Sequence, residues 1–185
     1  MRSSHSRSFF SQLLSSCLAV GLALSTTTAF ADGFVQFDGI SGESTDKDHK
    51  KWIDITSFEQ GASASSSSGG TGRSRAAAQF SDIKIRKGVD AASPKLAEAL
   101  AQGKAFSSVK LQLTANLGGT RATYYEVELK SVRVTSYQLG GSVDGVPTEE
   151  LSLNFEEIKV TYTKYDAKGK KAGSVSYTWN VRSAV

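Results

Sequence analysis

The sequence predicts a mainly β protein, a compact β-barrel of bent antiparallel strands with one flanking α-helix. After residue 31, apolar residues mostly recur at every second position, the period of a strand with one buried face. In two long stretches this alternation slips by one residue, as it does when a β-bulge bends a strand. One segment alone has the start, spacing and stop of a helix.

Alternating apolar residues mark the expected strands. Val109 and Leu111 alternate with polar residues, and Val175, Tyr177 and Trp179 do the same near the C-terminus. Because alternate side chains share one face, we expect Trp179 to point into the barrel interior. Turns rich in glycine and polar residues are expected between strands at 116–120, 140–147 and 166–173.

The two slips in the alternation predict bends. Leu129 is followed by Val132, and Phe155 is followed by Ile158, so that one extra residue stands between apolar positions in each case. We expect bulges at 130–131 and 156–157. They would bend strands too long for a flat sheet, as in a closed barrel or in a sandwich whose strands turn corners.

One helix is predicted after residue 92. Ser93 can cap it, Pro94 suits the first helical position, and Gly103 ends it. Its narrow apolar face, formed by Leu96, Ala97, Leu100 and Ala101, is sufficient to cover one side of a barrel but not to form a separate layer.

The N-terminus has the pattern of a cleavable export signal. A basic stretch and an apolar run precede Ala29-Phe30-Ala31, an A-x-A pattern that predicts cleavage between Ala31 and Asp32. Residues 1–31 are therefore expected to be a signal peptide, and 32–185 a single secreted or periplasmic domain. The apolar run is shorter than the about 20 residues that span a bilayer. A competing interpretation is a lipoprotein box ending at Cys17.

Composition excludes several function classes. A hydrophobic fraction of 39% is ordinary for a globular domain. The formal charge is +4, but residues 1–31 hold two arginines and no acid, so the rest carries +2, too balanced for a dedicated nucleic-acid surface. Because Cys17 is the single cysteine, the rest of the chain has no disulfide, thiolate nucleophile or sulfur metal site.

Residues 61–75 consist almost wholly of Ser, Gly, Ala, Thr and Arg. Such a segment cannot bury enough apolar surface to order itself, so we expect a mobile loop in an isolated subunit. Loops of this length inside compact domains are usually functional.

The sequence predicts no catalytic, cofactor-binding or metal-binding residue. His49, the only histidine after residue 31, lies among charged residues and is interpreted as part of a solvated loop rather than as a catalytic base. Asp46 and Asp48 lack the pattern of a calcium loop. Glu156 and Glu157 are adjacent, so on a regular strand they face opposite sides.

Two other patterns are weak. The stretch 69–74 superficially resembles a phosphate loop but lacks the lysine, the first glycine and a following helix. Five aromatic residues leave open a sugar-stacking platform, although aromatics on alternating strands are more often core or cross-strand pairs. They are Trp52, Tyr124, Tyr125, Tyr162 and Trp179.

Several motifs occur in a specific order. They are D-G-I-x-G-E-S at 38–44, His49-Lys50, I-D-I-T-S-F at 53–58, S-P-K-L at 93–96, T-E-E-L-S-L-N-F at 148–155 and W-N-V at 179–181. Together they resemble the haemolysin-coregulated protein (Hcp) family, the tube subunit of bacterial type VI secretion. The positions that carry the resemblance are Asp38, Gly39, Gly42, Glu43, Ser44, His49, Asp54, Pro94, Asn154, Phe155 and Trp179.

The resemblance implies a β-barrel with a flanking helix that assembles as a six-membered ring, and rings that stack into a tube. In that family a contractile sheath drives out the tube, which carries effectors beneath a spike, and no catalysis is implied. The expected partners are therefore further copies of the chain and spike, sheath and effector proteins. The family's extended loop reaches a neighbouring ring, which assigns ring stacking here to Gly61, Ser65, Gly69, Gly70, Arg73 and Arg75.

The predicted signal departs from the family, whose subunits are loaded from the cytoplasm without one. One hypothesis is a type VI tube subunit with a non-functional signal or a misplaced start codon. The other is an exported Hcp-like protein with a separate binding or structural role in the periplasm or outside the cell. A glycan-binding β domain is a third, less favoured alternative.

Overall fold

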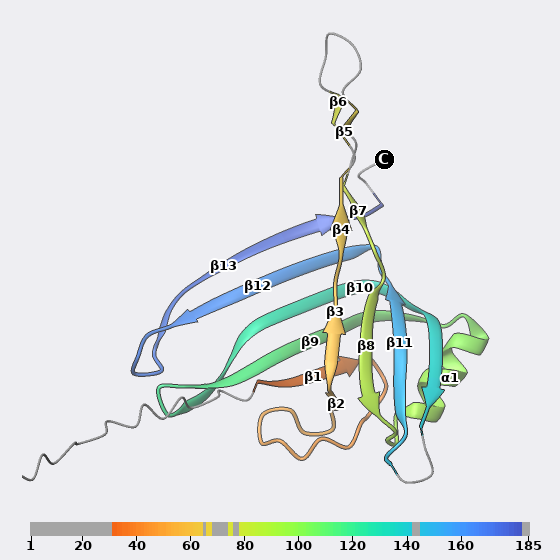
Figure 1. Ribbon diagram of the computed structural model, residues 1–185, viewed down its shortest axis with the longest axis horizontal. Helices are drawn as coiled ribbons and strands as arrows, with labels where there is room; N and C mark the ends of the chain where they lie inside the picture. The colour runs from red at the N-terminus through yellow and green to blue at the C-terminus, as the bar shows by residue number, and fades with distance from the viewer. Residues whose placement is uncertain (1–30, 65, 68–73, 76–77, 142–144, 183–185) are drawn as a thin grey trace, which may run out of the picture.

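The computed structural model describes residues 31–64, 66–67, 74–75, 78–141 and 145–182. The chain is mainly β with one helix, as predicted (Figure 1). The elements are β1 (Asp32–Phe37), β2 (Ile53–Ile55), β3 (Ser57–Glu59), β4 (Ala62–Ser63), β5 (Ser66–Ser67), β6 (Ser74–Arg75), β7 (Gln79–Phe80), β8 (Ile83–Gly88), α1 (Ser93–Gln102), β9 (Ala105–Leu117), β10 (Thr120–Gly140), β11 (Thr148–Asn154), β12 (Glu157–Tyr165) and β13 (Lys171–Asn180). Of the predicted signal, Ala31 alone lies within the described residues.

Nine strands form one antiparallel sheet in the order β2-β1-β9-β10-β11-β8-β3, with β12 paired to β10 and β13 paired to β12. The two ends of this path, β2 and β3, are separated in the chain by Thr56 alone. Thr56 N donates a hydrogen bond to the carbonyl of Arg86 on β8, at 2.8 Å. The sheet therefore curls back on itself at Thr56 and forms a compact, barrel-like body, although no ladder among the described strands joins β2 to β3.

The bends predicted at 130–131 and 156–157 lie opposite each other. Strand β10 pairs with β12 up to Lys130 and with β11 from Arg133 onward. Between these ladders Ser131 has a φ of +52°, in the left-handed region. Opposite this point, Glu156 lies between β11 and β12 and donates its N–H to the carbonyl of Lys130 at 3.1 Å. The long strand β10 thus pairs with β12 on one side of this point and with β11 on the other, and these two strands diverge here.

The register shifts of β10 lie elsewhere. They fall between Thr123 and Tyr125 against β9, and between Val134 and Ser136 against β11. At 130–131 the pairing of β10 with β9 keeps its register. The strand therefore bends here without the β-bulge that the sequence predicted.

Helix α1 packs on one end of the body (Figure 1). Gly103 ends the helix with a φ of +62°, as predicted. The N-cap is Ala92 and not Ser93, and the Ser93 hydroxyl instead accepts hydrogen bonds from Lys87 Nζ and from the Asp90 N–H, both at 3.0 Å. Leu96 and Ala99 are buried, whereas Ala101, predicted on the apolar face, is exposed.

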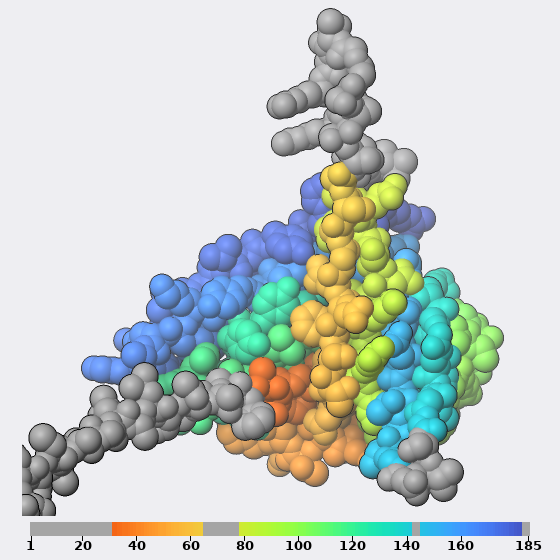
Figure 2. All heavy atoms as spheres, in the orientation of Figure 1, coloured from red at the N-terminus to blue at the C-terminus, as the bar shows by residue number. Residues whose placement is uncertain are grey.

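Two structures project from the body. We call β12, β13 and the adjoining parts of β9 and β10 the wing; it extends to the left in Figure 1. We call β4, β5, β6 and β7 the arm; β4 pairs with β7 and β5 with β6, and the arm rises at the top of Figure 1. In Figure 2, β4 and β7 lie at the upper margin of the coloured atoms. Within the part of the chain described, no helix has the length and apolarity needed to cross a bilayer.

Candidate functional site

The wing carries a row of exposed apolar side chains. On β13, Val175, Tyr177 and Trp179 keep 74%, 46% and 38% of their surface exposed. They continue onto Tyr162 of β12, which is the register partner of Val175 and is also exposed. We call Tyr162, Val175, Tyr177 and Trp179 the wing strip. Exposed apolar patches of this kind mark interaction surfaces.

The prediction that Trp179 lies in the barrel interior is wrong. Trp179 faces Ile158 across the β12–β13 ladder, and Tyr177 faces Val160. Residues directly opposite each other present their side chains to the same face. Ile158 and Val160 are buried, so the alternation correctly placed Trp179 on the face of the sheet that carries the core. The core ends beneath β12, however, and β13 lies beyond it.

The base of the arm covers part of the wing strip. The Phe80 ring of β7 lies 6.3 Å from the Trp179 ring and 6.4 Å from that of Phe155, centroid to centroid. Gln60 donates its side-chain N–H to the Tyr177 hydroxyl at 3.3 Å. The remaining surface of the strip is exposed, and among the described strands β13 pairs with β12 alone, so its other edge is unpaired there.

The opposite face of the wing is polar and charge-paired. Glu128 accepts from Lys110 at 2.7 Å and from Lys159 at 3.3 Å, and Lys130 pairs with Glu157 at 2.5 Å. The hydrogen bond from Lys110 lowers the pKa of Glu128, despite partial burial, and Glu128 in turn raises the pKa of Lys110. The charges on this face are paired within the subunit, whereas the wing strip on the other face is exposed and apolar.

A buried ionic cluster fastens α1 to the sheet. Lys87 Nζ lies 2.7 Å from Glu149 Oε2, 2.8 Å from Asp90 Oδ1 and 3.0 Å from Ser93 Oγ. The Tyr137 hydroxyl donates to Glu149 at 2.6 Å. Burial opposes ionisation of Glu149, but the bonds from Lys87, Tyr137 and Ser93 outweigh it and lower its pKa. Burial, followed by the bond to Glu149, raises the pKa of Tyr137 to about 12.

Sequence reasoning missed this cluster, although a signal was present. Ile83 and Ile85 are buried, so the strand period places Lys87 on the same face. The same period places Glu149 with the buried Leu151 and Leu153. A cation and an anion at core positions of two strands predict a buried pair.

The expectation that His49 belongs to a solvated loop is also wrong, because His49 is 3% exposed. Its Nδ1 lies 2.7 Å from Asp46 Oδ1, and its ring stacks on Phe34 with centroids 4.1 Å apart. Burial opposes ionisation of Asp46, but the hydrogen bond with His49 and the neighbouring Arg121 lower its pKa. The loop is thereby fastened to the sheet.

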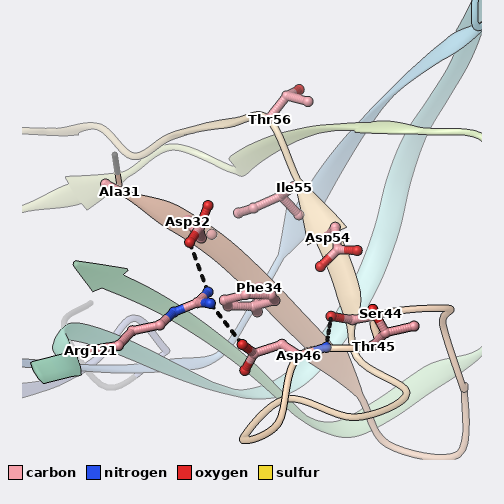
Figure 3. A pocket seen from close by; sticks show the side chains of 11 residues that line it. Ala31, Asp32, Phe34, Ser44, Thr45, Asp46, Asp54, Ile55, Thr56 and Arg121 are labelled. Atoms are coloured by element: carbon pink, nitrogen blue, oxygen red, sulfur yellow. Dashed lines mark hydrogen bonds and ion pairs between the residues drawn. The ribbon is translucent and has the colours of Figure 1, made fainter. Parts of the chain in front are cut away.

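Beside this loop lies a cleft of about 510 Å³ (Figure 3). Arg121 reaches across it and bonds Asp32 at 2.8 Å and Asp46 at 2.9 Å. Asp54 lines the same cleft, which has no nucleophile activated by a base among its described residues. Nor does any group of three or more His, Cys, Asp or Glu in the described residues have the arrangement of a metal site.

The five aromatic residues considered for a sugar platform do not form one group, although Tyr125 and Tyr162 are register partners. Tyr124 and Tyr162 line a cavity of about 520 Å³ at the end of the wing. Tyr125 packs near Phe58, Trp52 meets His49 edge-on, and Trp179 packs near Phe80. Glu156 and Glu157 likewise bind different partners, Arg182 and Lys130.

The motif positions near the N-terminus shape the loop that holds His49. Gly42 is required because a Cβ there would lie 2.4 Å from the carbonyl oxygen of Trp52. Gly39 has a φ of +78°. Asp38 accepts from Ser107, Glu43 accepts from the Ala91 N–H at 3.2 Å, and Ser44 accepts from the Asp46 N–H at 3.4 Å.

The later motif positions are structural as well. Asn154 donates to Asp82 at 2.8 Å, Phe155 is buried, and Pro94 lies in the first turn of α1. Of the proposed stacking positions, Gly61 and Arg75 are described, whereas Ser65, Gly69, Gly70 and Arg73 lie outside the described residues, as does Cys17.

Comparison with known proteins gives a consistent set of relatives. The family described as "Type VI secretion system effector, Hcp" matches residues 34–162, from β1 into β12. The chain is 35% identical over 157 residues to Protein hcp1 of Pseudomonas aeruginosa, covering 83% of this chain and 97% of that protein. A solved structure described as "Structure of a type six secretion system protein" has a TM-score of 0.79 at 30% identity, covering 84% of this chain and 99% of that one. A type VI secretion system effector from Yersinia pestis has a TM-score of 0.65 at 25% identity, covering 81% and 100%.

Proposed function

Because the chain belongs to the Hcp family of type VI secretion proteins, we propose that it is a non-enzymatic structural subunit that assembles with copies of itself into a ring. In this proposal the rings form a tube, the subunit is secreted, and effectors travel in the lumen. Its partners are other copies of the chain and the spike, sheath and effector proteins of a type VI system.

The wing strip is the observation that carries the proposal. Tyr162, Val175, Tyr177 and Trp179 form one continuous apolar row at the margin of the subunit. A ring needs a head-to-tail contact, in which one surface of a subunit meets a different surface of the next. An apolar row that the subunit itself leaves exposed supplies one half of that contact.

The arm supports the stacking part of the proposal. Its two short ladders, β4–β7 and β5–β6, extend away from the body (Figure 1), and the sequence of 61–75 is rich in serine and glycine. Residues 61–78 contain no apolar side chain larger than alanine, so they contribute little to the core of their own subunit. Ladders that project in this way are suited to reach a second ring, and we assign stacking to 61–75.

The N-terminal sequence favours a second candidate function, that of an exported Hcp-like protein with a separate periplasmic or extracellular role. The predicted cleavage point immediately precedes Asp32, the first residue of β1. N-terminal sequencing of protein from separated cell fractions distinguishes the two. A start at Asp32 in the periplasm favours export, an intact Met1 in the cytoplasm contradicts it, and acylated Cys17 identifies a lipoprotein.

Two neighbouring substitutions on β13 test the ring. Val175 belongs to the wing strip, and Ser176 points to the opposite, polar face; both are exposed. Light scattering of the purified wild type and of Ser176→Asp is expected to give a ring, whereas Val175→Asp gives monomers, because a carboxylate in an apolar contact lacks a partner. A wild type that stays monomeric at every concentration overturns the proposal. Rings that persist in Val175→Asp place the contact elsewhere.

A further inference from the structure

Two hairpin turns meet at the far end of the wing and line a cavity of about 520 Å³, which we call the tip cavity. One turn joins β9 to β10, and the other joins β12 to β13 (Figure 1). Their backbones touch, because a Cβ added at Gly118 would lie 2.5 Å from the carbonyl oxygen of Ala167. A Cβ added at Gly169 would likewise lie 2.5 Å from the carbonyl oxygen of Leu117. The two glycines therefore permit the contact that shapes the cavity.

The turn between β12 and β13 is held in place by the subunit itself. Asp166 Oδ1 accepts the backbone N–H groups of Lys168 and Lys170, both at 2.9 Å. The Tyr165 hydroxyl donates to the carbonyl of Thr123 on β10 at 2.9 Å. The wall of the tip cavity is therefore formed before any ligand binds.

Three tyrosines line the tip cavity, namely Tyr124, Tyr162 and Tyr165. Asn116 and Thr163 line it as well, and their side chains make no hydrogen bond within the described residues. Small-molecule sites are typically cavities of about 300–1,000 Å³ with aromatic walls and a few polar groups. A sugar ring has an apolar C–H face bordered by hydroxyls, so it matches tyrosine rings that stand beside free polar side chains.

The rim of the tip cavity is positively charged. Lys164 lies two residues beyond Tyr162 on β12, so the strand period places it on the same face. Lys168 and Lys170 belong to the turn whose Asp166 lines the cavity. All three lysines are exposed, and in the part of the chain that the structure describes none of their ammonium groups has an ion-pair partner.

The other lysines of the wing have carboxylate neighbours. Lys110 and Lys159 bind Glu128, and Lys130 binds Glu157. Lys171 lines a different cavity together with Glu126. Asp166 is the one acid among the described residues that line the tip cavity, so three unpaired ammonium groups outnumber it. This excess of positive charge favours an anionic ligand.

We propose that the tip cavity binds an acidic sugar, with the sugar ring against Tyr124 and Tyr162 and its carboxylate or phosphate at Lys164 and Lys168. Asn116 and Thr163 supply hydrogen bonds to the sugar hydroxyls. Because Tyr162 also belongs to the wing strip, a bound sugar and a second copy of the chain compete for it. The inference does not rest on ring formation.

Isothermal titration calorimetry with four probes tests the site. The probes are a disaccharide of galacturonic acid, galactose 6-phosphate, a neutral galactose disaccharide of the same linkage, and inorganic phosphate. At low salt we expect an acidic sugar to bind about tenfold more tightly than the neutral one, the combined effect of two exposed ion pairs. The difference should shrink as salt screens these charges. The two acidic probes show whether a carboxylate or a phosphate is preferred.

The titrations are made on the wild type and on Trp179→Ala, in which assembly is expected to be weaker. Absence of binding by both acidic sugars in both proteins would overturn the proposal, whatever the oligomeric state. Inorganic phosphate that binds as tightly as the acidic sugars would also overturn it, because the lysines alone would then account for binding.

Two matched pairs of variants separate the tip cavity from the rest of the wing. Tyr162 and Tyr177 are 50% and 46% exposed, but only Tyr162 lines the cavity. Tyr162→Ala is expected to weaken binding about tenfold, and Tyr177→Ala to leave it unchanged. Lys164→Gln is expected to weaken it about threefold, whereas Lys159→Gln, on the opposite face of β12, leaves it unchanged. Equal affinities within either pair would contradict the assignment.

Discussion

Trp179 of β13 and Ile158 of β12 lie directly opposite each other on the same face of the sheet, yet Ile158 is fully buried and Trp179 is 38% exposed. The hydrophobic core therefore stops between two hydrogen-bonded neighbours. Beyond that line the wing continues with apolar residues on a face that its own subunit covers only in part. This exposed apolar row is the feature on which the proposed contact between subunits rests.

Alanine substitutions at these two positions are expected to differ: Ile158→Ala should mainly reduce stability, and Trp179→Ala should mainly reduce assembly. Ile158→Ala creates a cavity and should lower the free energy of unfolding by about 2–5 kcal/mol. Trp179→Ala removes a partly exposed ring and should lower it by about 1–2 kcal/mol. Urea denaturation of dilute monomer measures both. Light scattering should show that Trp179→Ala weakens assembly more, and a larger loss of monomer stability in Trp179→Ala than in Ile158→Ala contradicts this assignment.

Shortening the arm should separate stacking from ring formation. Replacing residues 66–75 with Asn-Gly removes the β5–β6 ladder and leaves the β4–β7 ladder in place. Stability should change little, because halving a loop alters its closure entropy by only about 0.6 kcal/mol. Electron microscopy of concentrated samples is expected to show single rings for this variant and stacks for the wild type. Stacks that persist without the segment assign the ring junction to other residues.

Removing the cation of the buried cluster should be among the most damaging single changes. Lys87→Met leaves the Glu149 carboxylate, which is 2% exposed, without its counter-ion, and breaking such a pair costs about 3–5 kcal/mol. The double variant Lys87→Met/Glu149→Leu should be more stable than the single one, because the Glu149 carboxylate is no longer buried without a cation; Asp90 loses its ion pair with Lys87 in both. Denaturant unfolding of the two variants gives the comparison, and equal stabilities would show that charge burial is not the cause.

Tyr137 should make stability depend on pH at the alkaline end. Burial and the bond to Glu149 raise its pKa to about 12, whereas an unfolded tyrosine titrates at about 10. A folded pKa above the unfolded one means that this contribution is complete below about pH 10 and is lost as the pH approaches 12. Unfolding free energies measured across this range should fall more steeply in the wild type than in Tyr137→Phe. Parallel curves for the two proteins argue against the Tyr137–Glu149 bond.

Local sequence patterns were sufficient for the fold. Alternation identified the strands, the parity slips at 130–131 and 156–157 located the bends, and Gly103 marked the end of α1. These features depend on residues close together in the chain. The motifs, taken in their order along the chain, also predicted the Hcp family correctly.

Features that depend on distant residues were not predicted. Alternation predicts on which face of the sheet Trp179 lies. It does not predict that the hydrophobic core covers β12 on that face and ends before β13. Charged neighbours suggested that His49 is exposed, because nothing local reveals Phe34 and Gln112 as its contacts. The Lys87–Glu149 pair joins residues 62 positions apart.

The oligomeric state of the wild-type protein tests the central claim most directly. Negative-stain electron microscopy of the purified protein, with class averages examined for rotational symmetry, is the measurement. The account predicts closed rings of six subunits with a central pore. Isolated single subunits across the accessible concentration range would contradict it.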